Sequence, residues 1–286
     1  MLFGHDSIGL YLCFAPVDTF VPIIIVFILG AAVGSFLNVV VYRLPAGLSL
    51  LYPPSRCPKC EKRLKPYDNV PVLGWMWLLG RCRNCKLPIS IRYPMVEFST
   101  GALFVAVFLM FGATWRTPGY WVFVCWLLSL ALIDLDTMTL PNSLTSSGLV
   151  LGWLFQGWMS YLENPTLSHV GSGVVLSVIA SVLGLLLFDF VGIAGSRAFG
   201  KAAMGGGDAK LAAMMAAWLG WPALLLITFL AAAMGAVIGS SALALGVLGP
   251  KQHIPFGPYL ALGALLTLFY GAWMIETYRS IFFPIG

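Results

Sequence analysis

Residues 19–43 read TFVPIIIVFILGAAVGSFLNVVVYR, an apolar run that carries no charge until it ends at Arg43. A helix that crosses a membrane needs about 20 apolar residues, so this run is long enough to span one. Further apolar runs lie near residues 96–112, 118–133, 143–161, 170–193, 207–220, 222–247 and 255–276. The sequence therefore predicts an all-α polytopic membrane protein with about eight transmembrane helices.

Composition excludes two other classes of protein. The chain has 286 residues, of which 59% are hydrophobic and 9% are charged, and its mean hydropathy is +0.91. Soluble domains are about a quarter charged, so these values exclude a water-soluble globular protein. The ample apolar surface also excludes a disordered chain. Residues 1–18 lack a basic region followed by a cleavage site of small residues, so no removable signal peptide is expected.

Basic residues gather in the polar window that follows the first apolar run. Ten of the 16 Lys and Arg residues lie between Arg43 and Arg92. Nucleic-acid binding is one explanation of such a basic block. A block beside membrane spans is better explained by the positive-inside rule, which places basic loops in the cytoplasm, so no nucleic-acid partner is expected.

Eight spans would bring the loops near 134–142, 194–208 and 248–254 to the same side as this window. They add four basic residues to the ten, namely Arg197, Lys201, Lys210 and Lys251, and leave only Arg116 and Arg279 outside. The bias predicts a multi-pass protein with both termini outside and the polar window in the cytoplasm. Three regions are expected: an outer segment with the first helix (1–42), a cytoplasmic domain (43–94) and a seven-helix membrane core (95–286).

Four cysteines in the polar window form two matched pairs. C-P-K-C supplies Cys57 and Cys60, and C-R-N-C supplies Cys82 and Cys85 after 21 intervening residues. Two such pairs give the tetrahedral sulfur ligation that suits zinc, and four thiolates leave no open position for water, so a structural ion is expected. Two disulfides are a competing interpretation, which a reducing cytoplasm disfavours. A redox pair is a third, and iron in place of zinc remains open.

Several acids lie where charge is costly, in or near the apolar runs. These are Glu97, Asp134, Asp136, Asp189 and Asp208. Asp134 ends the third run and Asp208 begins the sixth, so the topology brings both to the same membrane face. Two adjacent carboxyls share one proton, and such a pair can activate water and protonate the attacked carbonyl. Alternatives are a solvated Asp136, a helix-capping Asp208 and a proton-relay or packing role for Asp189.

Six ordered blocks between residues 34 and 264 resemble the type IV prepilin leader peptidases, which are G-x-G-D aspartic membrane proteases. These blocks are G-S-F-L-N-V-V-V-Y-R-L-P, the two Cys pairs with D-N-V-P between them, R-Y-P-M-V-E, the I-D…L-P-N segment, G-G-G-D-A-K-L, and P-F-G-P-Y-L-A-L-G-A. The resemblance implies a bacterial inner-membrane enzyme. Such an enzyme cuts the basic leader from type IV prepilins or type II secretion pseudopilins at the cytoplasmic face.

The resemblance also implies residue roles and a second activity. The first catalytic Asp of the family lies seven residues before the Pro of its L-P-N segment. In this sequence that residue is Asp134 rather than Asp136, and the second catalytic Asp is Asp208. Many bacterial members then methylate the new N-terminus with S-adenosylmethionine, and the domain with the Cys pairs is linked to that step. The sequence departs from the family pattern at two places. Residue 202 is Ala, where relatives often have an acid, and the stretch after Pro45 is short and apolar, where many relatives are longer and charged.

Two other classes of function use the same residues. A transporter or proton relay would make Asp189 as important as Asp134, and it gives no reason for the Cys pairs. A methyltransferase or binding module anchored by an inactive bundle would depend entirely on Cys57. Under the peptidase hypothesis, the apolar helix of the prepilin enters the bundle laterally, and anionic lipid headgroups are the expected partner of the basic window.

Overall fold

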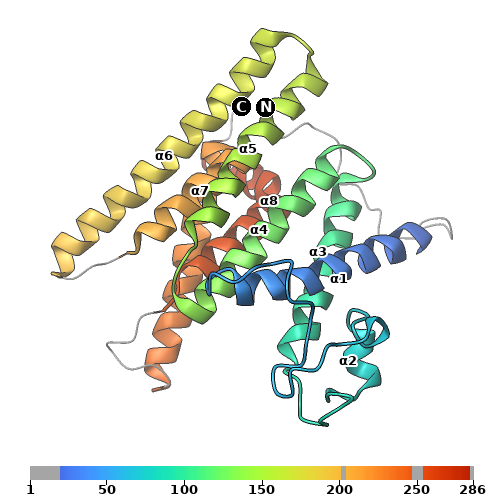
Figure 1. The fold of residues 1–286 in the computed structure, drawn as a ribbon. Helices are drawn as coiled ribbons and strands as arrows, with labels where there is room; N and C mark the ends of the chain where they lie inside the picture. The colour runs from blue at the N-terminus through green and yellow to red at the C-terminus, as the bar shows by residue number, and fades with distance from the viewer. Residues whose placement is uncertain (1–19, 201–203, 247–253, 284–286) are drawn as a thin grey trace. The chain divides into compact units, whose positions relative to one another are not determined.

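The computed structural model describes residues 20–200, 204–246 and 254–283, and these residues are mainly helical (Figure 1). The helices are α1 (Phe20–Arg43), η2 (Pro66–Asp68), α2 (Leu73–Trp77), α3 (Arg92–Phe111), α4 (Arg116–Thr137), α5 (Asn142–Glu163), α6 (Leu167–Phe199), α7 (Gly206–Ala244) and α8 (Gly257–Phe282). The described ranges hold no strand beyond isolated bridges. The all-α fold class is confirmed, with a four-Cys segment between α1 and α3 that we call the insert (residues 44–91).

The element α7 consists of two helical segments that meet at a break at Gly220, whose φ of 81° and ψ of 168° are not helical. This break lies between the predicted runs 207–220 and 222–247. Pro222 explains the break, because proline lacks an N–H donor and its ring clashes with the preceding turn. Six described helices are long and apolar enough to cross a membrane; α5 is of similar length but is not among them. The chain is therefore a multi-pass membrane protein.

The described residues fall into two compact units, with the boundary after Ser129 in α4. In the first unit α1 packs closely on α3. A Cβ atom on Gly34 would lie 2.8 Å from the backbone of Glu97, so only glycine permits this approach. Val26, Leu37, Phe104 and Cys125 form a buried cluster beside this contact.

In the second unit the first half of α7 is the central element. Its residues Leu211 to Trp218 are almost completely buried against the neighbouring helices. Three hydrogen bonds to backbone carbonyls fix its place: Trp218 Nε1 donates to Gly148 O, Gln156 to Trp218 O and Ser177 to Ala217 O, at 2.8, 2.6 and 2.7 Å. Such bonds stabilise helix packing where no water is present to satisfy polar groups.

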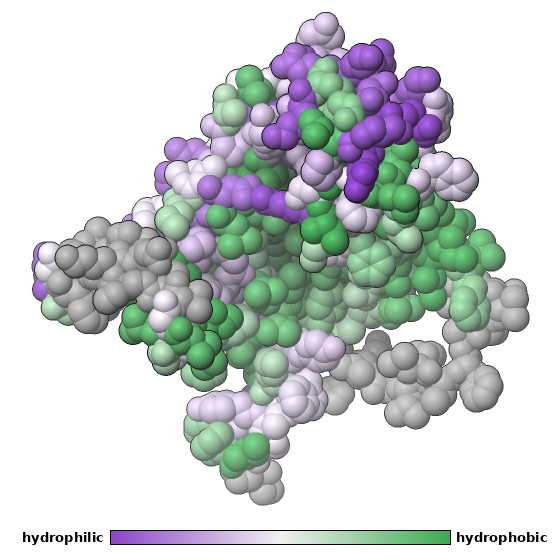
Figure 2. Space-filling view, turned by 90° about the horizontal axis from the view of Figure 1, so that it is seen from below, coloured by the Kyte–Doolittle hydropathy of each residue, from purple (hydrophilic) through white to green (hydrophobic). Residues whose placement is uncertain are grey.

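Large apolar side chains are exposed along the spanning helices. Ile24 and Ile28 of α1, and Leu186 and Phe190 of α6, are each more than half exposed. Figure 2 shows a broad hydrophobic surface, with hydrophilic side chains gathered at one end of that view. Exposed apolar surface of this extent is not typical of soluble monomers. It is the surface that helices present to lipid tails.

The amino-terminal segment expected outside the membrane, together with His5 and Cys13, lies outside the described residues. The same holds for Lys201 and Ala202 before α7 and for Lys251 and His253 before α8.

Candidate active site and metal site

The four cysteines of the two pairs meet in one cluster. Cys57 and Cys82 are buried and Cys60 and Cys85 are partly buried, and all four Sγ atoms lie within 4.8 Å of one another. The Sγ atoms of Cys57 and Cys85 are 3.9 Å apart, as are those of Cys60 and Cys82. A disulfide bond measures about 2.05 Å, so neither contact is one. Sulfurs bound at about 2.3 Å to one tetrahedral ion stand about 3.8 Å apart, which fits the cluster.

The local backbone explains how each pair presents its thiols. Both pairs form the same knuckle, in which the residue after the second cysteine, Glu61 or Lys86, has a φ near 60°. The N–H of that residue donates to the carbonyl of the first cysteine at 2.9 and 3.0 Å. Hydrogen bonding from the backbone N–H of Cys85 lowers the pKa of the Cys82 thiol to about 7. This favours the thiolate, which is the form that binds a metal.

Asp134 and Asp208 come together in the second unit. Asp134 lies near the C-terminal end of α4 and is 6% exposed. Its Oδ2 accepts a hydrogen bond of 2.9 Å from the backbone N–H of Gly257, which begins α8. Asp208 lies in the first turn of α7, close enough to Asp134 for the two carboxyls to interact electrostatically. The N-cap residue of α7 is Gly205 rather than Asp208, and the Asp208 carboxyl accepts a hydrogen bond from the backbone N–H of Gly205.

The chain around the two acids is held by contacts between distant segments. A Cβ atom on Gly207 would lie 3.1 Å from the side chain of Leu140, so the glycine permits this close approach. Lys210 Nζ donates to Asn142 Oδ1 at 2.6 Å, which joins the first turn of α7 to the start of α5. The L-P-N and G-G-G-D segments therefore support each other directly.

Comparison with known proteins identifies the family. Residues 121–240 match the model of the Type IV leader peptidase family, and residues 28–111 match the model of the Bacterial Peptidase A24 N-terminal domain. The chain belongs to the type IV leader peptidase family. This confirms the resemblance inferred from the sequence motifs.

Curated relatives of this leader peptidase family carry the name "Prepilin leader peptidase/N-methyltransferase". The protein of Aeromonas hydrophila is 36% identical over 90% of this chain and 94% of its own length. That of Myxococcus xanthus is 40% identical over 80% of this chain and 66% of its own. That of Pseudomonas aeruginosa is 35% identical over 88% and 91%. No solved structure matches the chain.

The other acids take different positions. Asp136 is exposed, although only Leu135 separates it from the buried Asp134. Asp189, for which a proton-relay or packing role was considered, has an exposed side chain on α6 and lines a hollow with Gly205 and Gly206. No hydrogen bond or ion pair among the described residues joins Asp189 to either Asp134 or Asp208. Glu97 lies in the first unit and takes no part in the pair.

Sequence reasoning did not find the role of Gly257. This glycine belongs to the P-F-G-P-Y block, which the family resemblance includes, but nothing in the block itself indicates a partner. Its N–H meets a carboxylate 123 residues earlier in the chain. A Cβ atom at this position would lie 2.6 Å from Asp134 Oδ2, so the need for glycine comes from the acid it contacts.

Proposed function

We propose that this leader peptidase is an intramembrane aspartic endopeptidase that removes the basic leader from type IV prepilins or type II secretion pseudopilins. The single observation that carries the proposal is the proximity of Asp134 and Asp208 in a chain of this family. In such a pair one carboxyl is ionised and the other protonated. The ionised acid takes a proton from water, the resulting hydroxide attacks the scissile carbonyl, and the protonated acid donates to the carbonyl oxygen.

Gly257 has a positioning role in this mechanism. Its N–H holds one oxygen of Asp134, so the carboxylate keeps a fixed orientation toward its partner. The Lys210–Asn142 hydrogen bond holds the turn that carries Asp208. Catalysis by paired groups depends on such fixed geometry, since a misplacement of about 1 Å can lower the rate about 100-fold.

The second proposed activity is N-methylation of the new amino terminus, with S-adenosylmethionine as the methyl donor. The names of the relatives, which join the two activities, support this step. We place the enzyme in the bacterial inner membrane, with the insert and the acid pair at the cytoplasmic face and both termini outside. The substrate helix packs laterally against the bundle. Anionic lipids are the proposed partner of the basic insert.

Zinc is the ion we propose for the four-Cys cluster. Cys57, Cys60, Cys82 and Cys85 would close its coordination shell, so its contribution is to folding. An insert this small has little apolar core, and metal binding supplies part of its folding free energy. The ion takes no part in peptide hydrolysis.

Replacing Cys57 with Ser tests the structural role of the metal. Purified wild type should hold about one zinc per chain by elemental analysis, and Cys57→Ser should hold almost none. The insert of the variant should also be cut by added protease while the helices resist. Cys125→Ser, which changes a buried cysteine outside the cluster, should keep its zinc. Full metal content in Cys57→Ser would contradict the proposed ligation.

Cleavage of a type IV prepilin in membranes containing the chain tests the peptidase proposal. Mass spectrometry of the product should show loss of the leader and then a gain of one methyl group. A prepilin that stays intact beside folded, metal-loaded protein would overturn the proposal. Transport through the acid-bearing helices would then be the next function to test.

A further inference from the structure

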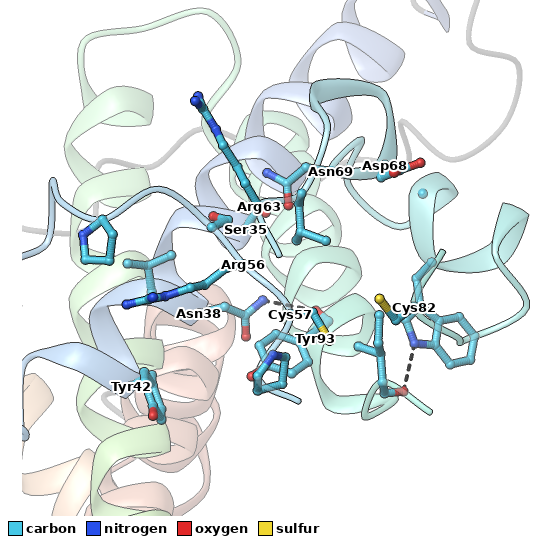
Figure 3. Close-up of a pocket in the computed structure, with 18 of the residues that line it drawn as sticks. Ser35, Asn38, Tyr42, Arg56, Cys57, Arg63, Asp68, Asn69, Cys82 and Tyr93 are labelled. Carbon is cyan, nitrogen blue, oxygen red and sulfur yellow. Dashed lines mark hydrogen bonds between the residues drawn. The ribbon is translucent and has the colours of Figure 1, made fainter. Parts of the chain in front are cut away.

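Two hollows of the molecule lie outside the acid pair. The first is a cavity of about 460 Å³ beside Glu97, between α1, α3 and the insert, where Asn38 Nδ2 donates to Tyr93 O at 3.1 Å (Figure 3). The family resemblance already links this segment to methyl transfer, so the cavity adds no new function. The second, of about 470 Å³, lies in the unit that holds the acid pair. We call it the α6–α7 hollow, because the end of α6 and the start of α7 line it.

One wall of the α6–α7 hollow reaches Asp208. Gly192 of α6 packs on Met204, since a Cβ atom on the glycine would lie 3.7 Å from Met204 Cβ. Gly205 is the next residue of the wall, and its N–H donates to the Asp208 carboxyl. A Cβ atom on Gly205 would lie 3.8 Å from Asp208 Oδ2. A group bound in the hollow therefore lies beside a residue that contacts one of the two reacting acids.

Asp189 supplies a negative charge to the α6–α7 hollow. It lies three residues before Gly192 on the same helix, and its side chain is exposed. No Lys, Arg or His in the described part of the chain forms an ion pair with it. Arg197 also lines the hollow, but it lies eight residues further along α6, or about 12 Å at 1.5 Å per residue. An acid in a membrane span without a counter-charge is costly, so a cation bound here would be stabilising.

Packing does not account for the charge of Asp189. It is the only Asp, Glu, Lys or Arg between Val170 and Ser196. Its neighbour Phe188 is buried, whereas the carboxyl group of Asp189 points away from the packed side of the helix and makes no hydrogen bond to another described residue. A neutral side chain would fit this exposed position at lower cost. The charge therefore indicates a partner from outside the chain.

The rest of the wall suits the stem of a long basic side chain. Ile193 and Met204 provide apolar surface, and Gly206 leaves room, since a Cβ atom there would meet nothing within 4 Å. Lys and Arg lay their methylene stems along apolar surface and keep the charged head at a polar group. The volume also lies within the range of about 300–1,000 Å³ found for ligand pockets. The hollow can therefore hold one such side chain with its head at Asp189.

We propose that the α6–α7 hollow is a subsite for the leader, in which the Asp189 carboxylate binds a lysine or arginine side chain that precedes the scissile bond. The inference rests on the proposed function, because the basic leader is the part of the substrate that carries such side chains. An extended chain advances about 3.3–3.6 Å per residue, so a basic residue a few positions before the bond reaches the hollow while the bond lies at Asp208. One carboxylate with Arg197 on the same wall offers too few oxygen ligands for a divalent cation.

The test compares two leaders in the full-length enzyme. Wild type and Asp189→Asn would each cleave a prepilin with its native leader and one whose leader Lys and Arg residues are changed to Gln. Vesicles of phosphatidylcholine carry no net charge, so lipids would not contribute to the preference. We expect wild type to cleave the native leader with about tenfold higher kcat/KM, the low end for a hydrogen bond between charged groups. Asp189→Asn should cleave both leaders alike, with kcat within about twofold of wild type.

Glu163→Gln is the matched control for the loss of a carboxylate. Glu163 is exposed at the end of α5, lies 3.7 Å from His169 near the opposite end of α6, and belongs to the same unit as Asp189. This variant should keep the tenfold preference. A second variant, Ile193→Lys, places an ammonium group one helical turn from Asp189 on the wall of the hollow. It should abolish the preference, because its own charge occupies the carboxylate.

A full preference for the native leader in Asp189→Asn would overturn the inference, and so would a wild type that cleaves both leaders equally. A wild type that cleaves neither leader would instead overturn the proposed peptidase. If Asp189→Asn does not fold, Ile193→Lys decides, and a preference retained in that variant would overturn the subsite.

Discussion

Asp208→Asn and Asp134→Asn should each abolish prepilin cleavage. Asparagine has almost the same shape as aspartate but cannot take a proton from water or donate one as an acid. Loss of a general acid or base lowers rates by about 10²–10⁴-fold, and here either change removes the shared proton as well. The expected loss is therefore at least about 10³-fold, or roughly 4 kcal/mol of transition-state stabilisation. Cleavage would be followed in membranes, with equal amounts of each variant confirmed by immunoblot.

The matched control for this prediction is Asp136→Asn. Asp136 lies two residues from Asp134, but its side chain is exposed rather than buried beside Gly257. It should keep most of the cleavage activity. Zinc content should be unchanged in all three variants, because the Cys cluster lies in the other unit. Full activity in Asp208→Asn would remove the acid pair from the mechanism.

Features that depend on local pattern could be predicted from the sequence. Long apolar runs give the membrane helices, because each must satisfy its backbone hydrogen bonds internally. The spacing of Cys57, Cys60, Cys82 and Cys85 gives the four-sulfur cluster, since each knuckle is a short local turn. The boundary between the sixth and seventh runs was also readable, because Gly220 and Pro222 both disfavour a continuous helix and α7 breaks at Gly220.

The topology placed Asp134 and Asp208 at the same membrane face, but most other contacts between distant segments could not be predicted. The burial of Asp134 beside an exposed Asp136 depends on where α8 begins, and the N–H of Gly257 is 123 residues away. The cavity beside Glu97 is lined by α1, the insert and α3, and no motif shows that they enclose a space. The sequence also could not predict which side of α6 carries Asp189. An apolar helix has little hydrophobic periodicity from which to assign its faces.

Gly257→Ala should impair cleavage strongly, although it adds only one methyl group. The new Cβ would lie 2.6 Å from Asp134 Oδ2 and 3.1 Å from its Cγ, and either the carboxylate or the start of α8 must move. Such movement breaks the 2.9 Å hydrogen bond that orients Asp134. A displacement of about 1 Å at a reacting group lowers rates about 100-fold, so kcat for cleavage should fall by about that factor.

The control for this change is Gly171→Ala in α6, where a Cβ atom would meet nothing within 4 Å. It should cleave at the wild-type rate, because alanine favours helix and causes no contact there. Normal cleavage by Gly257→Ala would mean that the orientation of Asp134 does not depend on α8.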